Sequence, residues 1–529
     1  MKNVFYNTDV IEAEKNLMEK YRIPSVLLME NAGANSAKII WDYFISEECS
    51  RIVILAGKGN NAGDGFVAAR TLYNYCLNQE VFFPINVFLC YPAESLKGDA
   101  LTNYNIVKEL FKSDYYEVTS DIERLNDILD TENEKILFVD AIFGIGFSGE
   151  LDENIKNIFS DISQYPDKKF VIALDTPSGL NNWYDSNDCL KADVTISMGI
   201  RKMNTMFYKG SNVSGELKVV DIGLPCEKFD EFNSKNIHLL EKDDTCFEEA
   251  VRNRNSHKYN NGKLFILAGS EGFSGAAYLS AQSALRTGNG AVILGIPESL
   301  NNTMELKTTE VITLPLKSEK YFTNESVDII TKKIEWSDAV LIGPGIGRES
   351  DTMSFMRSIV KKFNKNFVID ADGIFAFKNN LDLLNKEMSS IVLTPHFGEF
   401  ANLLGITVDE LKQDFINIAK KFASDFNVVL VLKNSPSIIT DGNITLINST
   451  GRENLATIGS GDVLSGIISS LVSQMKDVPL INIASSGVYL HGYCGDKLYE
   501  LYGSCGTIAG DLIEIIPAAK NGILKSYNI

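Results

Sequence analysis

A stretch of eleven residues, AGKGNNAGDGF (56–66), holds four glycines and two adjacent asparagines directly after the apolar run RIVIL. This order predicts a buried strand, a flexible polar loop and the start of a helix, which is the junction where open parallel sheets bind ligands. Glycines let the backbone approach a ligand closely, and free amides at a helix start attract anions such as phosphate. We therefore expect an anionic ligand here, with a tight turn capped by Asn or Asp as the structural alternative. The stretch is not a Walker loop, because no Gly-Lys-Ser/Thr follows it.

Polar side chains also follow other apolar runs in the first half of the chain. Asp140 lies in VDAIFGIGFSGEL (139–151), and Asp175 and Ser178 lie in LDTPSGL (174–180). Together with Asn61, Asp140 and Ser178 offer hard oxygen ligands suited to a non-transition cation. Asp175 closes a predicted strand, where it could exchange protons with a bound ligand. Each aspartate alone could instead cap a helix or complete a turn.

The second half carries a different constellation. ATIGSGDVLSG (456–466) places Gly-Ser-Gly-Asp at the start of an apolar helix. Consecutive amides there could neutralise the charge that develops on a transferred phosphoryl group. Asp462 would then take the proton from an attacking hydroxyl, with a plain helix N-cap as the alternative. His396 in TPHFGEF (394–400) follows a predicted strand and precedes Gly-Glu, which favours a functional role for this histidine.

Length and composition limit the classes of protein. A chain of 529 residues is too long for one ordinary core, so we expect two or three domains. Asp plus Glu number 69 against 50 Lys plus Arg, and the formal charge of −19 argues against nucleic acid or an anionic membrane as a partner. The eight cysteines contain no C-x-x-C pair, which argues against a zinc knuckle or a disulfide framework. With no signal peptide and no apolar run of about 18 residues, we expect a cytoplasmic protein.

Short β-branched runs alternate with helical-period segments along the chain and restart after a polar stretch near residues 226–256. Such continuous apolar strands predict parallel sheets covered on both faces by helices, in two α/β domains with a boundary near residue 235. The segment from Ile481 to Ile516 predicts two helices broken around LYGSCGT. The predicted strands are 51–57, 85–90, 135–141, 169–175 and 192–198 in the first half, and 263–270, 291–297, 339–345, 367–373, 391–396 and 428–434 in the second.

Both halves resemble one known pair of domains. The first resembles the NAD(P)H-hydrate epimerase domain through N-N-x-G-D-G, V-D-A-x-x-G-x-G and D-x-P-S-G. The second resembles the ADP- or ATP-dependent NAD(P)H-hydrate dehydratase through R-x-G-x-G, G-P-G-x-G, T-P-H-x-G-E and G-x-G-D-V-L-x-G. The resemblance implies a Rossmann-like three-layer αβα domain over residues 1–235 and a ribokinase-like αβα domain over residues 236–529.

The resemblance also implies what each half does. Hydration of the nicotinamide ring of NADH or NADPH leaves a hydroxyl at C6 in either configuration. The first domain would epimerise the R and S forms, and the second would dehydrate the S form to NAD(P)H. Because hydroxide is a poor leaving group, ADP or ATP would phosphorylate it, with Mg²⁺ on the phosphates of the nucleotide. The expected partners are the hydrated cofactor and the nucleotide, and we expect a homo-oligomer.

The resemblance places the functional residues in five groups. Asp175 and Asp462 would be catalytic, and Asn61, Asp140 and Ser178 would bind K⁺. The epimerase would contact its substrate through Asn60, Asn61, Ala62, Gly63, Asp64, Gly144, Ile145, Gly146, Phe147, Ser148, Gly149, Glu150 and Asp175. The dehydratase would contact its substrate through Ala276, Gly345, His396 and Asp462. It would contact the nucleotide through Lys433, Asn434, Ser435, Pro436, Ser437 and Gly461.

Four positions depart from the family pattern. Ala62 stands where glycine is common, which is a mild change if its φ stays negative. Asn289 replaces the usual alanine in R-x-G-A-G, Asn434 replaces the glycine after Lys433, and Ser460 replaces a threonine.

Two alternatives remain at this point. The second domain could be a small-molecule kinase for a vitamin precursor, which would yield a stable phosphorylated product. The first domain could be a non-catalytic nucleotide-binding scaffold. Asn61, Asp140, Asp175 and Ser178 together favour catalysis, since a scaffold has no need of all four.

Overall fold

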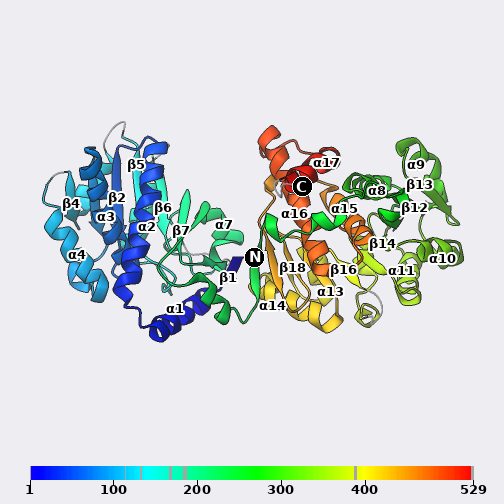
Figure 1. Ribbon diagram of the computed structural model, residues 1–529, viewed down its shortest axis with the longest axis horizontal. Helices are drawn as coiled ribbons and strands as arrows, with labels where there is room; N and C mark the ends of the chain where they lie inside the picture. Colours follow the sequence, from blue (N-terminus) through cyan, green and yellow to red (C-terminus); the bar gives the residue numbers. More distant parts are fainter. Residues whose placement is uncertain are drawn as a thin grey trace. The chain divides into compact units, whose positions relative to one another are not determined.

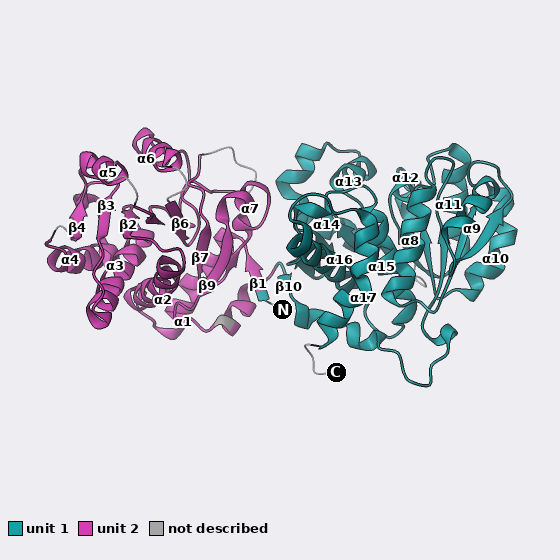
Figure 2. Ribbon diagram, turned by 90° about the horizontal axis from the view of Figure 1, so that it is seen from above, with its two compact units in different colours: residues 1–2, 235–529 teal, residues 3–234 magenta. Residues whose placement is uncertain are grey.

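The structure is a computed structural model that describes residues 2–113, 115–130, 134–165, 169–182, 188–385 and 390–525. The chain divides into two compact units, shown in different colours in Figure 2. One unit consists of residues 3–234, and the other of residues 1–2 and 235–529.

The unit of residues 3–234 is built on a parallel sheet of seven strands in the order β4-β3-β2-β5-β6-β7-β9. The order reverses between β2 and β5, and the carboxyl ends of strands beside such a switch point form a crevice that binds ligands. The strands are β2 (Arg51–Ala56), β3 (Ile85–Leu89), β4 (Tyr116–Thr119), β5 (Ile136–Ala141), β6 (Lys169–Leu174), β7 (Val194–Met198) and β9 (Glu216–Val220). A separate short pair joins β1 (Lys2–Phe5) to β8 (Arg201–Lys202) in parallel.

Helices cover both faces of this sheet. On β2, Ile52 and Ile54 point into a core formed with α1 to α4, whereas Val53 and Leu55 point into a core formed with α5 and α6. Burial on both faces explains why β2 reads as a continuous apolar run. The helices are α1 (Asn7–Tyr21), α2 (Ser25–Ser46), α3 (Asn60–Gln79), α4 (Gly98–Leu110), α5 (Ile122–Leu129), α6 (Glu153–Gln164) and α7 (Tyr208–Ser214).

The glycine-rich stretch is mostly helical, which differs from the predicted flexible loop. β2 ends at Ala56 and α3 already begins at Asn60, so only residues 57–59 connect them. The N-cap is Gly59, and no side chain caps the helix, so the predicted alternative of an Asn or Asp cap is wrong. Ala62 has helical φ within α3, which satisfies the condition for tolerating alanine at this position.

The glycines of this stretch serve packing within the unit. A Cβ on Gly63 would lie 2.5 Å from the side chain of Met29, and a Cβ on Gly65 would lie 2.7 Å from Ala141. Met29 ends in a flexible thioether that can move aside, whereas the Cβ of Ala141 cannot, so the close packing of α3 on β5 requires glycine at position 65. These two glycines therefore support the site from behind instead of approaching a ligand.

The second unit contains a sheet with the order β13-β12-β11-β14-β15-β16-β17-β18-β19-β10. Its pairs are parallel except β17 with β18 and β18 with β19, which corrects the prediction of wholly parallel sheets. Short connections join these three strands, and a parallel crossover needs a dozen residues or more. The strands are β10 (Ile237–Leu240), β11 (Lys263–Leu267), β12 (Ala291–Pro297), β13 (Ile312–Leu316), β14 (Ala339–Ile342), β15 (Asn366–Ile369), β16 (Ile391–Leu393), β17 (Val429–Leu432), β18 (Ile438–Thr440) and β19 (Thr445–Asn448).

One face of this sheet packs against α8, α15, α16 and α17, and Figure 1 shows α11, α13 and α14 on the opposite side. The predicted pair of helices near the end of the chain is present as α16 and α17. The helices are α8 (Ser274–Thr287), α9 (Asn301–Lys307), α10 (Val327–Trp336), α11 (Ser350–Lys362), α12 (Asp372–Phe375), α13 (Phe397–Leu404), α14 (Val408–Phe426), α15 (Ser460–Gln474), α16 (Leu480–Tyr502) and α17 (Ala509–Lys525).

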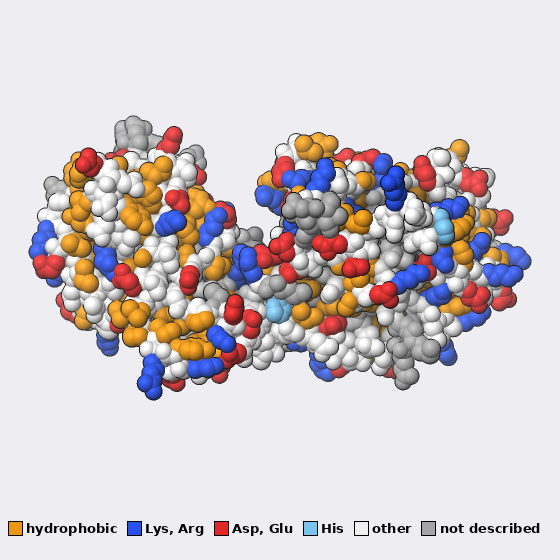
Figure 3. Space-filling model, viewed as in Figure 1, with side chains coloured by type: hydrophobic (Ala, Val, Ile, Leu, Met, Phe, Trp, Pro, Cys, Tyr) orange, Lys and Arg blue, Asp and Glu red, His pale blue; other side chains and the backbone are white. Residues whose placement is uncertain are grey.

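A strand is present within each of the eleven predicted runs, most of them ending one to three residues earlier than predicted. Acidic and basic side chains are interspersed on the face of the molecule drawn in Figure 3. Among the described residues, no helix combines the length and the apolar character that crossing a membrane requires.

Candidate functional site

A cavity of about 760 Å³ lies in the first unit, within the size range of small-molecule sites. It is lined by the segments that follow β2, β5 and β6, so it occupies the crevice at the switch point of the sheet. Helix α1 contributes Ile11 and Glu14. The remaining lining residues are Lys58, Gly59, Asn60, Asn61, Asp64, Tyr91, Ile142, Phe143, Gly144, Ile145, Gly146, Phe147, Ser148, Glu150, Asp152, Asp175 and Met198.

Most predicted epimerase residues line this cavity, and three do not. Ala62 is fully buried in the core and Gly63 faces Met29, so neither reaches the cavity wall. Gly149 also lies outside the lining. Ala62 and Gly63 do not line the cavity because α3 begins at Asn60, and successive residues of a helix point in different directions.

Asp140 and Ser178 come from different strands and lie in direct contact. Ser178 donates to Asp140 twice, from its hydroxyl to Oδ1 at 2.5 Å and from its amide to Oδ2 at 2.8 Å. The amide of Phe143 donates to the Ser178 hydroxyl at 2.9 Å. Asp140 therefore joins the segments after β5 and β6, which is more than a local cap or turn. Its full burial raises the pKa of the Asp140 carboxyl to about 6.

Asn61 carries a buried oxygen that lacks a hydrogen-bond partner. Its Nδ2 donates to the carbonyl of Leu174 at 3.2 Å, but Oδ1 has no partner among the residues that the structure describes. Buried polar atoms without a partner are uncommon and call for a ligand, an ion or water. An amide oxygen of this kind fits a hard cation such as K⁺.

Asp175 is held at the end of β6 by a buried ion pair. Lys202 Nζ lies 2.5 Å from Asp175 Oδ1, and the lysine side chain is 0% exposed. The amide of Ile145 donates to Asp175 Oδ2 at 2.9 Å. The backbone of Asp175 adopts φ of 68°, a left-handed conformation that is costly for a residue other than glycine and is concentrated at functional sites. Asp175 is thus a positioned side chain, and the alternative of a turn residue does not account for its partners.

Two further carboxyl groups of the cavity have raised pKa values. Burial raises the pKa of Glu14 to about 7, an effect that Lys202 opposes and Asp175 reinforces. Burial also raises the pKa of Asp64 well above its usual value, and the charges of Asp175 and Glu14 add to this effect. A carboxyl group with a pKa near neutrality, such as that of Glu14, can both give and take protons at pH 7.

Sequence reasoning missed Glu14 and Lys202. The signal for Glu14 is its place on α1, where Val10, Ala13 and Leu17 form the buried face. Glu14 lies four residues after Val10 and three residues before Leu17. This spacing puts it on the apolar side of an amphipathic helix, where a charged residue is unusual. Lys202 carries no local signal in the sequence.

In the second unit, a cavity of about 580 Å³ opens beside the segments that follow β16, β17 and β19. Its lining includes the predicted residues His396, Lys433 to Ser437 and Gly461. Ala276, Gly345 and Asp462 do not belong to the lining. The other lining residues are Asn448, Thr450, Gly451, Arg452, Glu453, Leu455, Ala456, Thr457, Ile458, Ser460, Leu464, Val488, His491 and Gly492.

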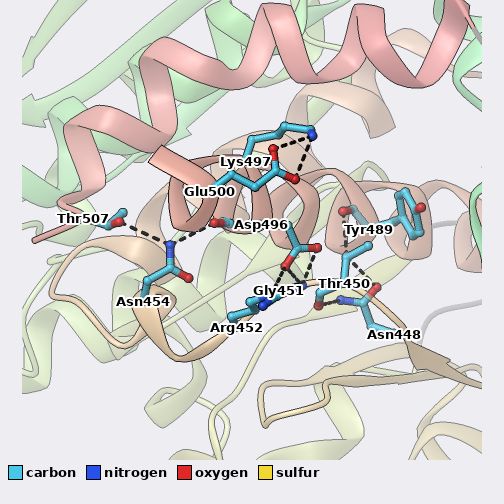
Figure 4. A network of polar contacts seen from close by, with 11 residues as sticks. Asn448, Thr450, Gly451, Arg452, Asn454, Tyr489, Asp496, Lys497, Glu500 and Thr507 are labelled. Carbon is cyan, nitrogen blue, oxygen red and sulfur yellow. Dashed lines mark hydrogen bonds and ion pairs between the residues drawn. The ribbon is translucent and has the colours of Figure 1, made fainter. Parts of the chain in front are cut away.

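One wall of this cavity is the segment 449–458, which α16 holds in place (Figure 4). The amide of Gly451 donates to both oxygens of Asp496, at 3.1 and 3.2 Å. Arg452 lies 3.6 Å from Asp496 and stacks on the ring of Tyr499. Asn454 donates to the carbonyl of Gly495 at 2.9 Å. These contacts pin the wall at several points, so the cavity is largely preformed.

A cluster of charges lies at the edge of the cavity. Lys433 Nζ is 2.8 Å from Asp370 Oδ1 and 4.0 Å from Glu399 Oε2. A Cβ on Gly461 would lie 3.4 Å from Lys433 Nζ, which brings the lysine to the start of α15. His396 caps α13 by accepting from the amide of Glu399, and its ring is largely exposed at the cavity. His396 therefore has both a structural contact and access to a ligand.

Asp462 lies in the first turn of α15 and does not cap it. The N-cap of α15 is Gly459, with φ of 88° and no capping side chain, so the alternative of a plain N-cap at Asp462 is wrong. Burial raises the pKa of Asp462 to about 7, reinforced by the charge of Asp370 and opposed by Lys433. A carboxyl group with this pKa suits general-base work near neutral pH.

Ala276 and Gly345 meet at the switch point of the second sheet, between β11 and β14. A Cβ on Gly345 would lie 2.9 Å from the Cβ of Ala276, and φ of Gly345 is 58°. The carbonyl of Gly345 accepts from the hydroxyl of Ser270 at 2.8 Å. Ala276 and Gly345 thus lie at the β11/β14 edge, whereas His396 lines the cavity that contains the predicted nucleotide residues.

The departures from the family pattern find structural partners. Asn289 is buried and donates to the hydroxyl of Ser473 at 3.0 Å, which ties β12 to α15. Ser460 contacts His491, whose pKa burial lowers to about 4. Nδ2 of Asn434 is buried and has no partner among the described residues, which leaves a donor for a ligand of the cavity.

Both halves of the chain match protein families. A family described as NAD(P)H-hydrate dehydratase matches residues 264–518, and one described as YjeF-related protein N-terminus matches residues 25–203. A bifunctional NAD(P)H-hydrate repair enzyme from Moorella thermoacetica is 33% identical over 506 residues, which are 94% of this chain and 93% of that protein. The enzyme of the same name from Dictyoglomus turgidum is 31% identical and covers 98% of this chain and 99% of its own.

Among solved structures, an ADP/ATP-dependent NAD(P)H-hydrate dehydratase from Bacillus subtilis, co-crystallised with ATP and Mg²⁺, is 25% identical. It covers 54% of this chain and 99% of its own, with a TM-score of 0.46.

Proposed function

The chain belongs to the family of bifunctional NAD(P)H-hydrate repair enzymes, and we propose that residues 1–235 form its epimerase domain and residues 236–529 its dehydratase domain. It is an isomerase and lyase of metabolite repair that returns hydrated NADH and NADPH to the reduced cofactor. The match to repair enzymes over nearly the whole chain carries this conclusion. The alternative of a vitamin-precursor kinase fused to a scaffold has no comparable support.

The epimerase substrate is assigned to the cavity at the β2/β5 switch point. Asn60, Asn61 and Asp64 line it from the start of α3, where backbone amides favour the phosphate groups of a dinucleotide. The segment from Gly144 to Ser148 and Glu150 also line it. Asp175 is assigned as a catalytic group, which its buried ion pair and its strained backbone support.

K⁺ is assigned to Asn61, Asp140 and Ser178. The unpartnered Oδ1 of Asn61 and the joined oxygens of Asp140 and Ser178 are hard donors that fit this ion. When bound, the ion supplies a fixed positive charge beside the buried Asp140 carboxylate. The residues themselves would then hold three separate segments around the substrate.

We expect Asp140→Ala to slow epimerisation and to leave dehydration of pure S epimer nearly unchanged, because the two reactions belong to different sheets. Replacing K⁺ by tetramethylammonium, which is too large for such a site, should slow the unmodified protein in the same way. Epimer composition over time, measured by chromatography, gives the rate. Asp127→Ala on the exposed side of α5 is the matched control. A loss of about 0.5–2 kcal/mol of stability without a catalytic defect would mean that Asp140 acts as a turn residue only.

In the dehydratase, the nucleotide is assigned to the cavity lined by Lys433 to Ser437 and Gly461, with ADP or ATP as the reactant. The hydrated cofactor is assigned to Ala276, Gly345, His396 and Asp462. The carboxylates around Lys433, those of Asp370 and Glu399, are hard oxygen donors that fit Mg²⁺. Asp462 would take the proton from the C6 hydroxyl as it attacks the phosphoryl group.

Repair of the S epimer is expected to require ADP or ATP together with Mg²⁺, because hydroxide cannot leave the ring unaided. Absorbance at the reduced-nicotinamide band, followed with each epimer and with or without nucleotide, measures the recovery of NADH. The R epimer without nucleotide should turn into a mixture of epimers and yield no NADH. Equal recovery of NADH from the S epimer with and without nucleotide would contradict the assignment. A cytoplasmic location and a homo-oligomeric state stay predictions.

A further inference from the structure

The cavity of the first unit contains a carboxyl group that no part of the proposed site uses. Glu14 extends from α1 between the buried residues Ala13 and Leu17, and it lines the cavity together with the segments that follow β5 and β6. Its carboxyl group makes no hydrogen bond or ion pair with any residue in the described part of the chain, although Asp175 and Lys202 act on it electrostatically. A carboxyl group that faces a ligand cavity without a partner is free to exchange protons with a ligand.

Asp175 lines the same cavity in a contrasting environment. Its Oδ1 faces the ammonium of Lys202 at 2.5 Å and its Oδ2 accepts from the amide of Ile145 at 2.9 Å. Burial raises the pKa of Glu14 to about 7, so a large share of this group is protonated at neutral pH. Pairs of titratable groups in contrasting environments mark the acid and the base of a reaction.

The cavity is also acidic as a whole. Its lining contains one lysine, Lys58, and five carboxyl groups, those of Glu14, Asp64, Glu150, Asp152 and Asp175. Such a lining stabilises positive charge that develops on a bound ring. It therefore favours a reaction in which the C6–O bond of the hydrated ring breaks and the ring becomes cationic.

We propose that Glu14 is a second catalytic residue of the epimerase, which protonates the departing C6 hydroxyl while Asp175 accepts a proton from the water that attacks the other face of C6. This proposal rests on the assignment of the epimerase substrate to this cavity. The C6–O bond breaks, and the oxygen keeps the electron pair of the bond. Glu14 gives its proton to this oxygen, which leaves as water. The lone pair of N1 forms the C6=N1 bond of an iminium. This electron pair returns to N1 when the new C6–O bond forms.

The step is balanced in atoms and charge. One water leaves and one water enters, Glu14 loses a proton and Asp175 gains one, and no oxidant or reductant is needed. Proton exchange with solvent restores the two carboxyl groups, and the reverse reaction uses them in opposite roles. Lys202 is a positioning residue in this scheme, because it holds Asp175 and does not line the cavity.

Three variants in the full chain test the proposal. In the absence of nucleotide, Glu14→Gln should lower conversion of the R to the S epimer by about 10²–10⁴-fold, the range typical of acid–base groups. Glu14→Asp should retain more activity than Glu14→Gln, because it keeps the carboxyl group. Glu12→Gln, an exposed position on the same helix, should leave the rate unchanged. Nucleotide-dependent dehydration of pure S epimer by Glu14→Gln should equal that of the unmodified protein, and an unchanged thermal unfolding curve shows that the first unit is folded.

The pH profile of epimerisation is a second readout. Glu14 lines a second, smaller cavity in addition to this one. The charged groups that line either cavity are Lys58, Asp64, Asp99, Glu150, Asp152 and Asp175, and Lys202 also acts on Glu14 electrostatically. The unmodified protein should lose activity as the pH rises through about 7, and Glu14→Gln should lose this limb of the profile. If Asp64→Asn removes the limb and Glu14→Gln keeps both limb and rate, Asp64 is the acid and the proposal for Glu14 is overturned.

Water enriched in ¹⁸O tests the bond that breaks. Each epimerisation should place one ¹⁸O at C6 in the product, and retention of the original oxygen would overturn the proposed C6–O step. The outcomes also separate this inference from the assignment on which it rests. If the unmodified protein fails to interconvert the epimers, the epimerase assignment is wrong. If it succeeds and Glu14→Gln is equally fast, only the role of Glu14 is wrong.

Discussion

Asp462→Asn is expected to lower dehydration of the S epimer by about 10²–10⁴-fold, the loss typical when a general base is removed, while epimerisation continues. Asp462 lies in the first turn of α15, beside the cavity edge where Lys433 meets Gly461. Asparagine nearly preserves the shape of the side chain and cannot accept the proton of the C6 hydroxyl. Release of NADH from pure S epimer with ADP and Mg²⁺ measures the loss.

The pH dependence of dehydration follows from the same residue. The pKa of Asp462 is raised to about 7, and the base works only after it has lost its proton. The kcat/KM of dehydration should therefore rise with pH and level off above about pH 7, falling about tenfold for each unit below it. Asp409→Asn, on an exposed side chain of α14, is the control and should leave rate and profile unchanged. An unchanged turnover in Asp462→Asn would mean that this residue has a structural role only.

The second large effect is expected for Asp175→Asn, which should lower epimerisation by about 10²–10⁴-fold and leave dehydration of the S epimer intact. It should also destabilise the first unit. Lys202 would keep its bond to the carbonyl of Met198, at 2.7 Å, but would lose the carboxylate with which it forms its buried ion pair. Breaking a buried pair by removing one partner typically costs about 3–5 kcal/mol.

A double variant separates the two effects. Asp175→Asn combined with Lys202→Met removes the uncompensated buried charge and should recover part of the lost melting temperature without restoring epimerisation. Asp161→Asn, at an exposed position of α6, is the control for the change of side chain. Recovery of epimerisation in the double variant would show that Asp175 serves stability alone. Thermal unfolding and the epimerisation rate of the same samples provide both readouts.

Much of the fold was predictable because its causes are local. A run such as RIVIL is apolar along its whole length, and a strand of a parallel sheet covered on both faces needs that composition. The contact between Asp140 and Ser178 was predictable for a geometrical reason. Segments that follow neighbouring parallel strands meet at one edge of the sheet, whatever the details of packing.

Local patterns failed where neighbouring elements decided the outcome. The stretch 57–65 has the composition of a loop, yet α3 begins at Asn60, and Gly65 allows this helix to pack closely on β5. The antiparallel strands β17, β18 and β19 also escaped prediction, because a short apolar run indicates a strand and says little about the direction of its partner.

The sequence by itself determined the family, the two α/β domains and part of the lining of the two cavities. Only the tertiary structure decided which charged groups act on one another. Lys202 meets Asp175 across 27 positions, and Lys433 meets Asp370 across 63. Glu14 reaches the cavity from a helix that precedes the whole sheet. The physical reason is that the charge state of a side chain depends on its burial and on the charges around it, and both are set by elements far apart in the chain.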